Sequence, residues 1–150
     1  MMRFIDTRTL PLLPPRTPPV LPMLIPHPYL RLYVDNTGRS HFEACTLPLG
    51  TRSFAPPTTP LEASEFLPAT GFVVVRFAGD WSGPWHPSPY RQWFFMLAGS
   101  LTITDGNGTE RTLCAGDVIL LDDMGTKGHL TRVNAGQQVV AVGVRVPDTA

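Results

Sequence analysis

The sequence has few charged residues and no excess of either sign. Only 16% of its 150 residues are charged, and 12 Lys and Arg balance 12 Asp and Glu. An average soluble protein has roughly 25% charged residues. Nucleic acids and anionic membrane surfaces attract proteins through an excess of basic charge. The charge balance therefore argues against nucleic acid and membrane as the main partner.

Long apolar runs and closely spaced cysteines are also missing. No stretch approaches about 18 uninterrupted apolar residues, so the sequence predicts no membrane-spanning helix. The apolar N-terminal segment is interrupted by proline every few residues and lacks the features of a signal peptide, so we expect a cytoplasmic protein. The two cysteines, Cys45 and Cys114, lie far apart without zinc-ribbon spacing, which predicts free thiols in a reducing compartment.

Proline is abundant, and its distribution divides the chain. The 17 prolines and 13 glycines argue against a helical bundle, because an interior proline costs a helix about 3 kcal/mol. Eight prolines lie in residues 1–28 and none in 90–146. We predict an extended proline-rich arm over residues 1–28 and one domain over 29–150. The arm's aliphatic residues, most of them leucines, indicate that it lies on its own domain or on a partner subunit. A disordered tail is the alternative.

Residues 29–150 carry the signals of an all-β domain. Short apolar or alternating segments are separated by turn residues such as those of 105–108, where Asn107 also begins a glycosylation sequon. We interpret that sequon as a turn. The predicted strands are 30–34, 40–44, 72–78, 92–98, 100–104, 109–113, 118–121, 129–133 and 138–146, with a loop over 48–70. This spacing is typical of a β-sandwich or barrel.

Three predicted strands are apolar on both faces, namely 72–75, 93–97 and 139–144. Such a strand belongs in the middle of a sandwich or at a subunit interface. Because the chain is short, we favour the interface and expect a homodimer.

Two segments resemble the motifs of the cupin superfamily. Residues 83–99 are similar to the first motif, G-x5-H-x-H-x3,4-E-x6-G, and residues 116–134 to the second, G-x5-P-x-G-x2-H-x3-N. With the hairpin between them, the resemblance covers residues 72–146. It implies a cupin-like double-stranded β-helix, also called a jelly-roll barrel, whose metal-binding motifs are degenerate.

The resemblance places His86 and His129 at histidine positions of the two motifs. Ser88 stands where the second histidine belongs, Gln92 takes the place of the glutamate, and Asp122 replaces the usual proline. Two imidazoles and one amide provide no negative charge, whereas a divalent cation usually takes at least one anionic ligand. We therefore expect no cofactor. The alternative is that Fe, Mn, Ni or Zn binds to His86, Gln92 and His129.

Strand alternation and loop composition add further candidates around this site. Residues 94 and 96 share the face of residue 92, and residue 131 shares the face of residue 129. Arg76 either points inward, where it suits a carboxylate or enolate oxygen, or lies on the outer face. The predicted catalytic residues are His86, Gln92, Asp122, Lys127 and His129, and the predicted substrate-binding residues are Arg76, Trp81, Trp85, Ser88, Tyr90, Phe94, Met96 and Thr131.

The segment from Asp122 to His129 also holds Asp123 and Lys127. It could supply an acid–base pair or form a solvated turn. With the aromatic residues nearby, these candidates predict an enzyme for a hydrophobic polyketide- or terpenoid-like metabolite of secondary metabolism. The expected reaction is metal-independent isomerisation, cyclisation, dehydration or decarboxylation. Two alternatives stay open: a metal-dependent cupin dioxygenase or isomerase, and a non-catalytic ligand-binding cupin.

Overall fold

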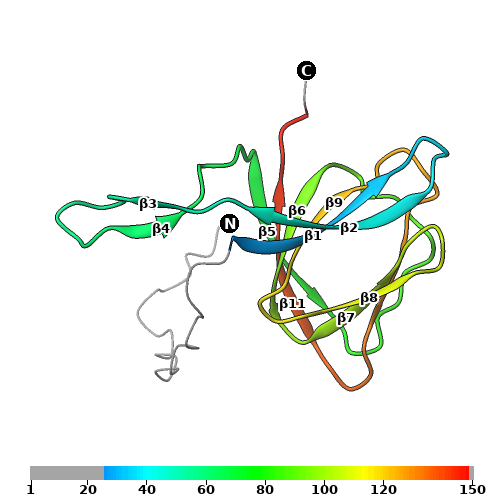
Figure 1. Cartoon of the computed structure of the whole chain (residues 1–150). Coiled ribbons are helices and arrows are strands. Elements are labelled where there is room, and N and C mark those ends of the chain that lie inside the picture. The colour runs from blue at the N-terminus through cyan, green and yellow to red at the C-terminus, as the bar shows by residue number, and fades with distance from the viewer. Residues whose placement is uncertain (1–25, 149–150) are drawn as a thin grey trace, which may run out of the picture.

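The protein is all-β in the computed structural model, which describes residues 26–148. No helix occurs in that range, so nothing in it forms a helix that could cross a membrane. In chain order the strands are β1 (His27–Val34), β2 (Ser40–Leu47), β3 (Gly50–Arg52), β4 (Leu61–Ala63), β5 (Gly71–Phe77), β6 (Gln92–Ala98), β7 (Ser100–Thr104), β8 (Glu110–Cys114), β9 (Val118–Asp122), β10 (Leu130–Val133) and β11 (Val139–Arg145). Figure 1 labels all of them except β10.

Two sheets enclose the core. The larger has the strand order β2-β1-β9-β6-β11-β5, and the smaller has the order β10-β7-β8. Neighbouring strands are antiparallel except β1 and β9, which run parallel. The two sheets face one another without joining into a closed barrel (Figure 1). This arrangement is consistent with a β-sandwich.

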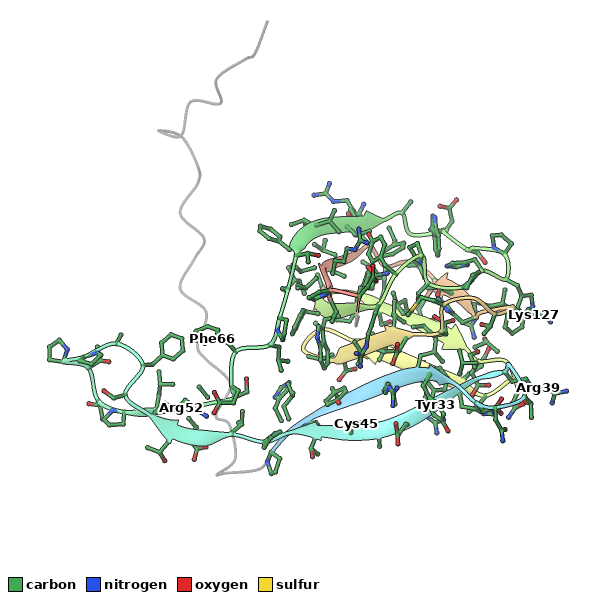
Figure 2. All side chains as sticks on the ribbon, turned by 90° about the horizontal axis from the view of Figure 1, so that it is seen from above. Tyr33, Arg39, Cys45, Arg52, Phe66 and Lys127 are labelled. Atoms are coloured by element: carbon green, nitrogen blue, oxygen red, sulfur yellow. The ribbon has the colours of Figure 1, made fainter. Side chains whose placement is uncertain are left out.

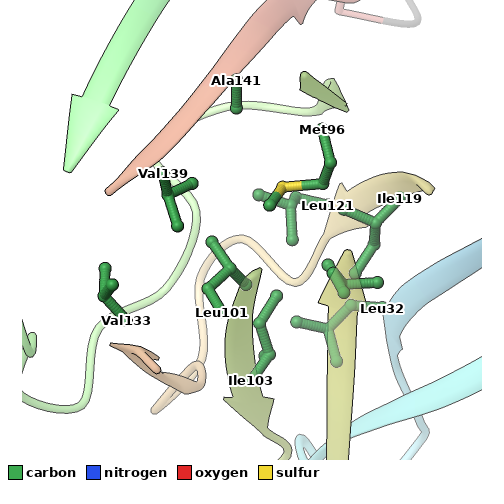
Figure 3. Packing of buried hydrophobic residues seen from close by; sticks show 10 residues of the cluster. Leu32, Met96, Leu101, Ile103, Ile119, Leu121, Val133, Val139 and Ala141 are labelled. Carbon is green, nitrogen blue, oxygen red and sulfur yellow. The ribbon is translucent and has the colours of Figure 1, made fainter. Parts of the chain in front are cut away.

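The core consists of aliphatic side chains from both sheets (Figure 3). Leu32, Ile119 and Ala141 of the larger sheet and Leu101 and Ile103 of the smaller are all at most 3% exposed. Full burial of one such leucine or isoleucine side chain contributes about 1.5–3 kcal/mol. The core therefore fixes the two sheets against each other and holds any cavity between them in a defined shape.

All nine predicted strands are confirmed, with ends that differ by three residues or fewer. The turn at 105–108 is confirmed as well, since Asp105 Oδ1 accepts hydrogen bonds from the N–H groups of Asn107 and Thr109. The predicted loop over 48–70 is wrong in part, because it contains β3 and β4. Each of these strands has only three residues, too few to show a periodic pattern among prolines and serines.

Strands β3 and β4 form a separate two-stranded sheet in which each strand pairs only with the other. This hairpin projects away from the two main sheets (Figures 1 and 2). The predicted proline-rich arm, 1–28, lies outside the described residues up to residue 25, and its last two residues already belong to β1. Cys45 and Cys114 are free thiols.

Candidate functional site

An apolar cavity of about 100 Å³ lies between the two sheets. Most of its wall is formed by aliphatic and aromatic side chains, and a few polar residues complete it. The lining residues are Phe77, Trp81, His86, Ser88, Pro89, Gln92, Phe94, Met96, Leu101, Ile103, Leu113, Ile119, Leu121, His129 and Thr131. A concave apolar wall with a few polar groups is the usual form of a small-molecule site, although such sites commonly have about 300–1,000 Å³ and this cavity is smaller.

Strand alternation supplies much of this lining. Gln92, Phe94 and Met96 are alternate residues of β6 and all three line the cavity, as do His129 and Thr131. Their side chains share a face because successive side chains of a strand point in opposite directions. The predicted inward faces of residues 92–96 and 129–131 are therefore the ones that line the cavity.

The two histidines are brought together by a β-bridge between the loop before β6 and the residue before β10. His86 N donates to His129 O at 3.1 Å, and His129 N donates to His86 O at 3.0 Å. Their ring centroids are 4.7 Å apart. Two residues 43 positions apart in the sequence thus place their imidazoles side by side on the cavity wall.

His129 is held by a buried carboxylate. Its Nδ1 donates to Asp123 Oδ2 at 2.6 Å, and the other carboxylate oxygen accepts the Ser88 N–H at 3.2 Å. Asp123 is fully buried and His129 is 3% exposed. Because Nδ1 is bound to Asp123, Nε2 is the ring nitrogen available to a ligand in the cavity.

The Asp123 carboxyl stays ionised in this setting. Burial raises the pKa of Asp123, but the hydrogen bond and charge of His129 and the hydrogen bond from the Ser88 N–H lower it by more, so this pKa lies below its usual value. A buried carboxylate that accepts the Nδ1 proton fixes the tautomer and orientation of the ring and stabilises the imidazolium form. The pair therefore has the arrangement of a general base, His129, and the carboxylate that orients it, Asp123.

His86 has the same tautomer for a different reason. Its Nδ1 donates to the carbonyl oxygen of Pro84 at 2.7 Å, which leaves Nε2 as an acceptor. His86 is half-buried, whereas His129 is buried. The two rings therefore differ in surroundings: His129 has a charged partner and His86 a neutral one.

Ser88 is buried beside this pair, at 3% exposure, and its Oγ has no hydrogen-bond partner among residues 26–148. An unsatisfied buried hydroxyl costs about 1–3 kcal/mol. We expect Ser88→Ala to raise the free energy of unfolding by about 1 kcal/mol, measured by urea denaturation.

The matched control for Ser88 is Ser40, which is 1% exposed. Its Oγ donates to Gly128 O at 2.7 Å and accepts from Gly106 N at 2.8 Å. Ser40→Ala should therefore lower the free energy of unfolding by about 1–3 kcal/mol. Equal destabilisation by both substitutions would contradict the assignment of the Ser88 hydroxyl as unpaired.

Asp122 and Lys127, both predicted to be catalytic, lie outside the cavity. Asp122 accepts from Arg31 Nη2 at 2.7 Å and lies 3.4 Å from Arg91 Nε. The Lys127 ammonium lies 4.4 Å from the ring centroid of Trp85. The Asp122 carboxylate is thus paired with arginines and the Lys127 ammonium with an aromatic ring. Burial of either charge without a partner would cost several kcal/mol.

Three predicted substrate-binding residues also lie outside the cavity. Trp85 contacts Lys127, and the Tyr90 ring lies under the Arg145 guanidinium at 4.7 Å. Arg76 is exposed, on the face of β5 opposite to Phe77. The outer-face alternative for Arg76 is thus the one the structure has. Trp81, Ser88, Phe94, Met96 and Thr131 do line the cavity.

The donor set at the cavity fits a divalent metal poorly. His86, Gln92 and His129 converge on it, but all three are neutral donors, and the nearby Asp123 carboxylate is turned to His129 Nδ1 and Ser88 N. Across the described part of the chain, no three His, Cys, Asp or Glu side chains gather closely enough to hold a metal ion. A hard divalent cation would therefore lack an anionic ligand here.

Asp123 was not among the predicted catalytic residues, although it lies in the segment from Asp122 to His129 that could supply an acid–base pair. The prediction also left out seven apolar residues of the wall, which are Phe77, Pro89, Leu101, Ile103, Leu113, Ile119 and Leu121. Alternation in 100–104 and 118–121 could have identified some of them, but not which face meets the cavity.

No protein-family model matches the chain, and no curated protein matches it at a significant level.

Proposed function

We propose that this protein is a small enzyme that holds a hydrophobic carbonyl compound between its two sheets and moves a proton on it without a metal. The reaction class is isomerisation, cyclisation, dehydration or decarboxylation, and polyketide- or terpenoid-like metabolites have the required chemistry. We also propose that the fold is a cupin-like double-stranded β-helix, and the resemblance of residues 83–99 and 116–134 to the cupin motifs supports this.

The observation that carries the proposal is the buried Asp123–His129 pair, whose histidine lines an apolar cavity. A catalytic base needs a lone pair directed at the ligand and a partner that stabilises the proton it takes up. His129 Nε2 provides the first and the Asp123 carboxylate provides the second. The apolar wall excludes water, which strengthens this electrostatic interaction.

The proton transfer follows from these groups. His129 Nε2 removes a proton from the carbon next to the substrate carbonyl, and the C–H electron pair moves into the enolate. The proton on Nε2 then returns to another carbon in an isomerisation, or to a departing hydroxyl in a dehydration. Ser88 Oγ and the Gln92 amide are the donors available to the enolate oxygen. Phe94 and Trp81 form the flat walls.

A generic carbon acid tests this chemistry without knowledge of the substrate. The probe is 5-nitrobenzisoxazole: a base removes its ring C–H proton, the C–H electron pair forms the nitrile, and the N–O bond breaks to release a coloured phenolate. We expect wild-type protein to accelerate this reaction and His129→Ala to lose about 100-fold of the rate, as is typical for a general base.

His41 provides the matched control. It forms a second aspartate–histidine pair, with Nε2 2.5 Å from Asp35 Oδ2, but it does not line the cavity. His41→Ala should leave the rate unchanged, and a chelator should have no effect. An equal loss in both alanine variants, or no acceleration by wild type, would overturn the proposal. Loss of the rate on chelation would favour the metal-dependent alternative.

A further inference from the structure

The exposed large hydrophobic side chains are gathered in one region of the molecule. Between residues 26 and 148 there are eleven of them, and Met124 is the only one outside 49–97. The other ten lie on the projecting β3–β4 hairpin and its connections, or on β5 and β6. They are Leu49, Phe54, Leu61, Phe66, Leu67, Phe72, Val73, Val74, Phe95 and Leu97. Val73 alternates with Phe72 and Val74 and therefore points to the opposite face of β5.

One part of this region is the outer face of the six-stranded sheet. Val142 of β11 pairs with Val74 of β5 on one side and with Phe95 of β6 on the other, so these three residues form one row across the sheet. The next row contains Phe72, Val144 and Trp93, and Trp93 is already buried within the single chain. Phe72 is 77% exposed and Val74 is 60% exposed. The face opposite to the core is thus apolar rather than polar, unlike a solvated sheet face.

The other part is the β3–β4 hairpin, which we call the projecting hairpin (residues 49–67). Its aromatic residues Phe54 and Phe66 contact each other with ring centroids 5.8 Å apart, yet they are 55% and 87% exposed. Figure 2 shows Phe66 on this hairpin, well away from the two main sheets. An isolated two-stranded hairpin is at best marginally stable in water, so this one needs a surface to pack against.

The apolar area suits a protein–protein interface. At about 200 Å² for each phenylalanine, the four exposed ones alone present roughly 500 Å² to solvent, and the leucines and valines add a comparable area. The largest apolar patch on a typical monomer is about 300–600 Å². A stable interface buries about 800 Å² on each partner. The whole region therefore reaches the size of a stable interface.

We propose that a second copy of this chain covers the region, with the projecting hairpin of each copy packed on the outer sheet face of the other. The segment after β4 runs directly into β5, where Thr70 N donates to Arg145 O at 3.0 Å. The projecting hairpin and the outer sheet face are therefore continuous in each copy. A two-fold axis between two copies lets the hairpin of each copy cover the sheet face of the other copy. This is the self-complementary surface that an isologous dimer requires.

Charge supports this choice of partner. Glu62 on the hairpin and Arg76 on the sheet face are both exposed, and neither has an ion-pair partner within residues 26–148. They have opposite signs, so they can form an ion pair where the hairpin of one copy packs on the sheet face of the other. The whole chain has zero net charge, so two copies do not repel one another through their net charge.

The test is the mass of the protein in solution, by sedimentation velocity at about 10 μM chain, where a dimer with a Kd of 1 μM or less is mostly associated. We expect a dimer for wild type and a monomer for Val74→Asp and for Phe66→Asp. Both positions are exposed in the single chain, so circular dichroism should show the same β spectrum for wild type and for both variants.

Met124→Asp is the matched control, because Met124 is 38% exposed but lies outside the region. It should leave the mass unchanged. A monomeric wild type would overturn the proposal. A monomeric Val74→Asp together with a dimeric Phe66→Asp would overturn the role of the hairpin. Because mass is measured rather than activity, these outcomes are independent of the proposed function.

Discussion

Replacement of Gly128 by alanine is expected to lower the free energy of unfolding by about 3 kcal/mol or more. Gly128 has φ +84°, and a Cβ there would come closer than 3.0 Å to the backbone oxygen and carbon of His86 and to Pro87 N. These atoms belong to the bridge that holds His86 against His129, so neither side can move away freely. The substitution therefore combines backbone strain with loss of the bridge.

Gly125→Ala separates the two contributions. Gly125 lies in the same loop with a similar φ of +73°, but a Cβ there meets nothing within 4 Å. It should cost only the left-handed backbone penalty, about 1 kcal/mol. Thermal unfolding measures both variants, and a loss of 3 kcal/mol corresponds to roughly 6–12 °C in Tm for a chain of this length. Similar losses in both variants would contradict the close approach at His86.

Much of the fold could be predicted because local pattern and tertiary environment agree in this chain. Residues 92–98 alternate between a cavity-facing set and an outward set, and the observed strand β6 has the predicted bounds. The turn at 105–108 combines asparagine, aspartate and glycine, which favour that backbone conformation for local reasons. Neither prediction depended on the rest of the molecule.

The choice between Asp122 and Asp123 could not be made in the same way. Asp122 is the last residue of β9 and points to Arg31, whereas Asp123 points inward to His129. Neighbouring side chains of a strand point in opposite directions, so one of the two adjacent aspartates points inward. Because both residues are aspartates, residue type does not say which one. Only the register against β1 and β6, which involves residues far away in the sequence, selects the inward one.

The aromatic residues near His86 show the same limit. Trp81 lines the cavity, but Trp85 and Tyr90 pair with Lys127 and Arg145 instead. A loop lacks the periodicity that assigns side chains to a face, so closeness in sequence to a histidine does not predict which aromatic residues reach the ligand.

Replacement of Asp123 by asparagine should lower both stability and catalysis. The variant loses a buried charge-assisted hydrogen bond, which costs about 2 kcal/mol at neutral pH. An asparagine amide can also donate to His129 Nδ1 and so move the ring proton to Nε2, where it blocks the base. We expect the rate with 5-nitrobenzisoxazole to fall about 100-fold or more. Asp35→Asn, in the surface pair with His41, should leave that rate unchanged.

The pH dependence of stability identifies the charge at residue 123. Because the pKa of Asp123 is below its value in the unfolded chain, about 3.9, the unfolded state binds more protons at acid pH. The contribution of Asp123 is therefore fully present above about pH 5 and is lost as the pH falls through the folded pKa. Urea denaturation should show a gap between wild type and Asp123→Asn at pH 5 that narrows as the pH falls below 4. A gap that stays constant down to pH 3 would mean that the carboxylate is not stabilised by His129, and the general-base assignment would lose its support.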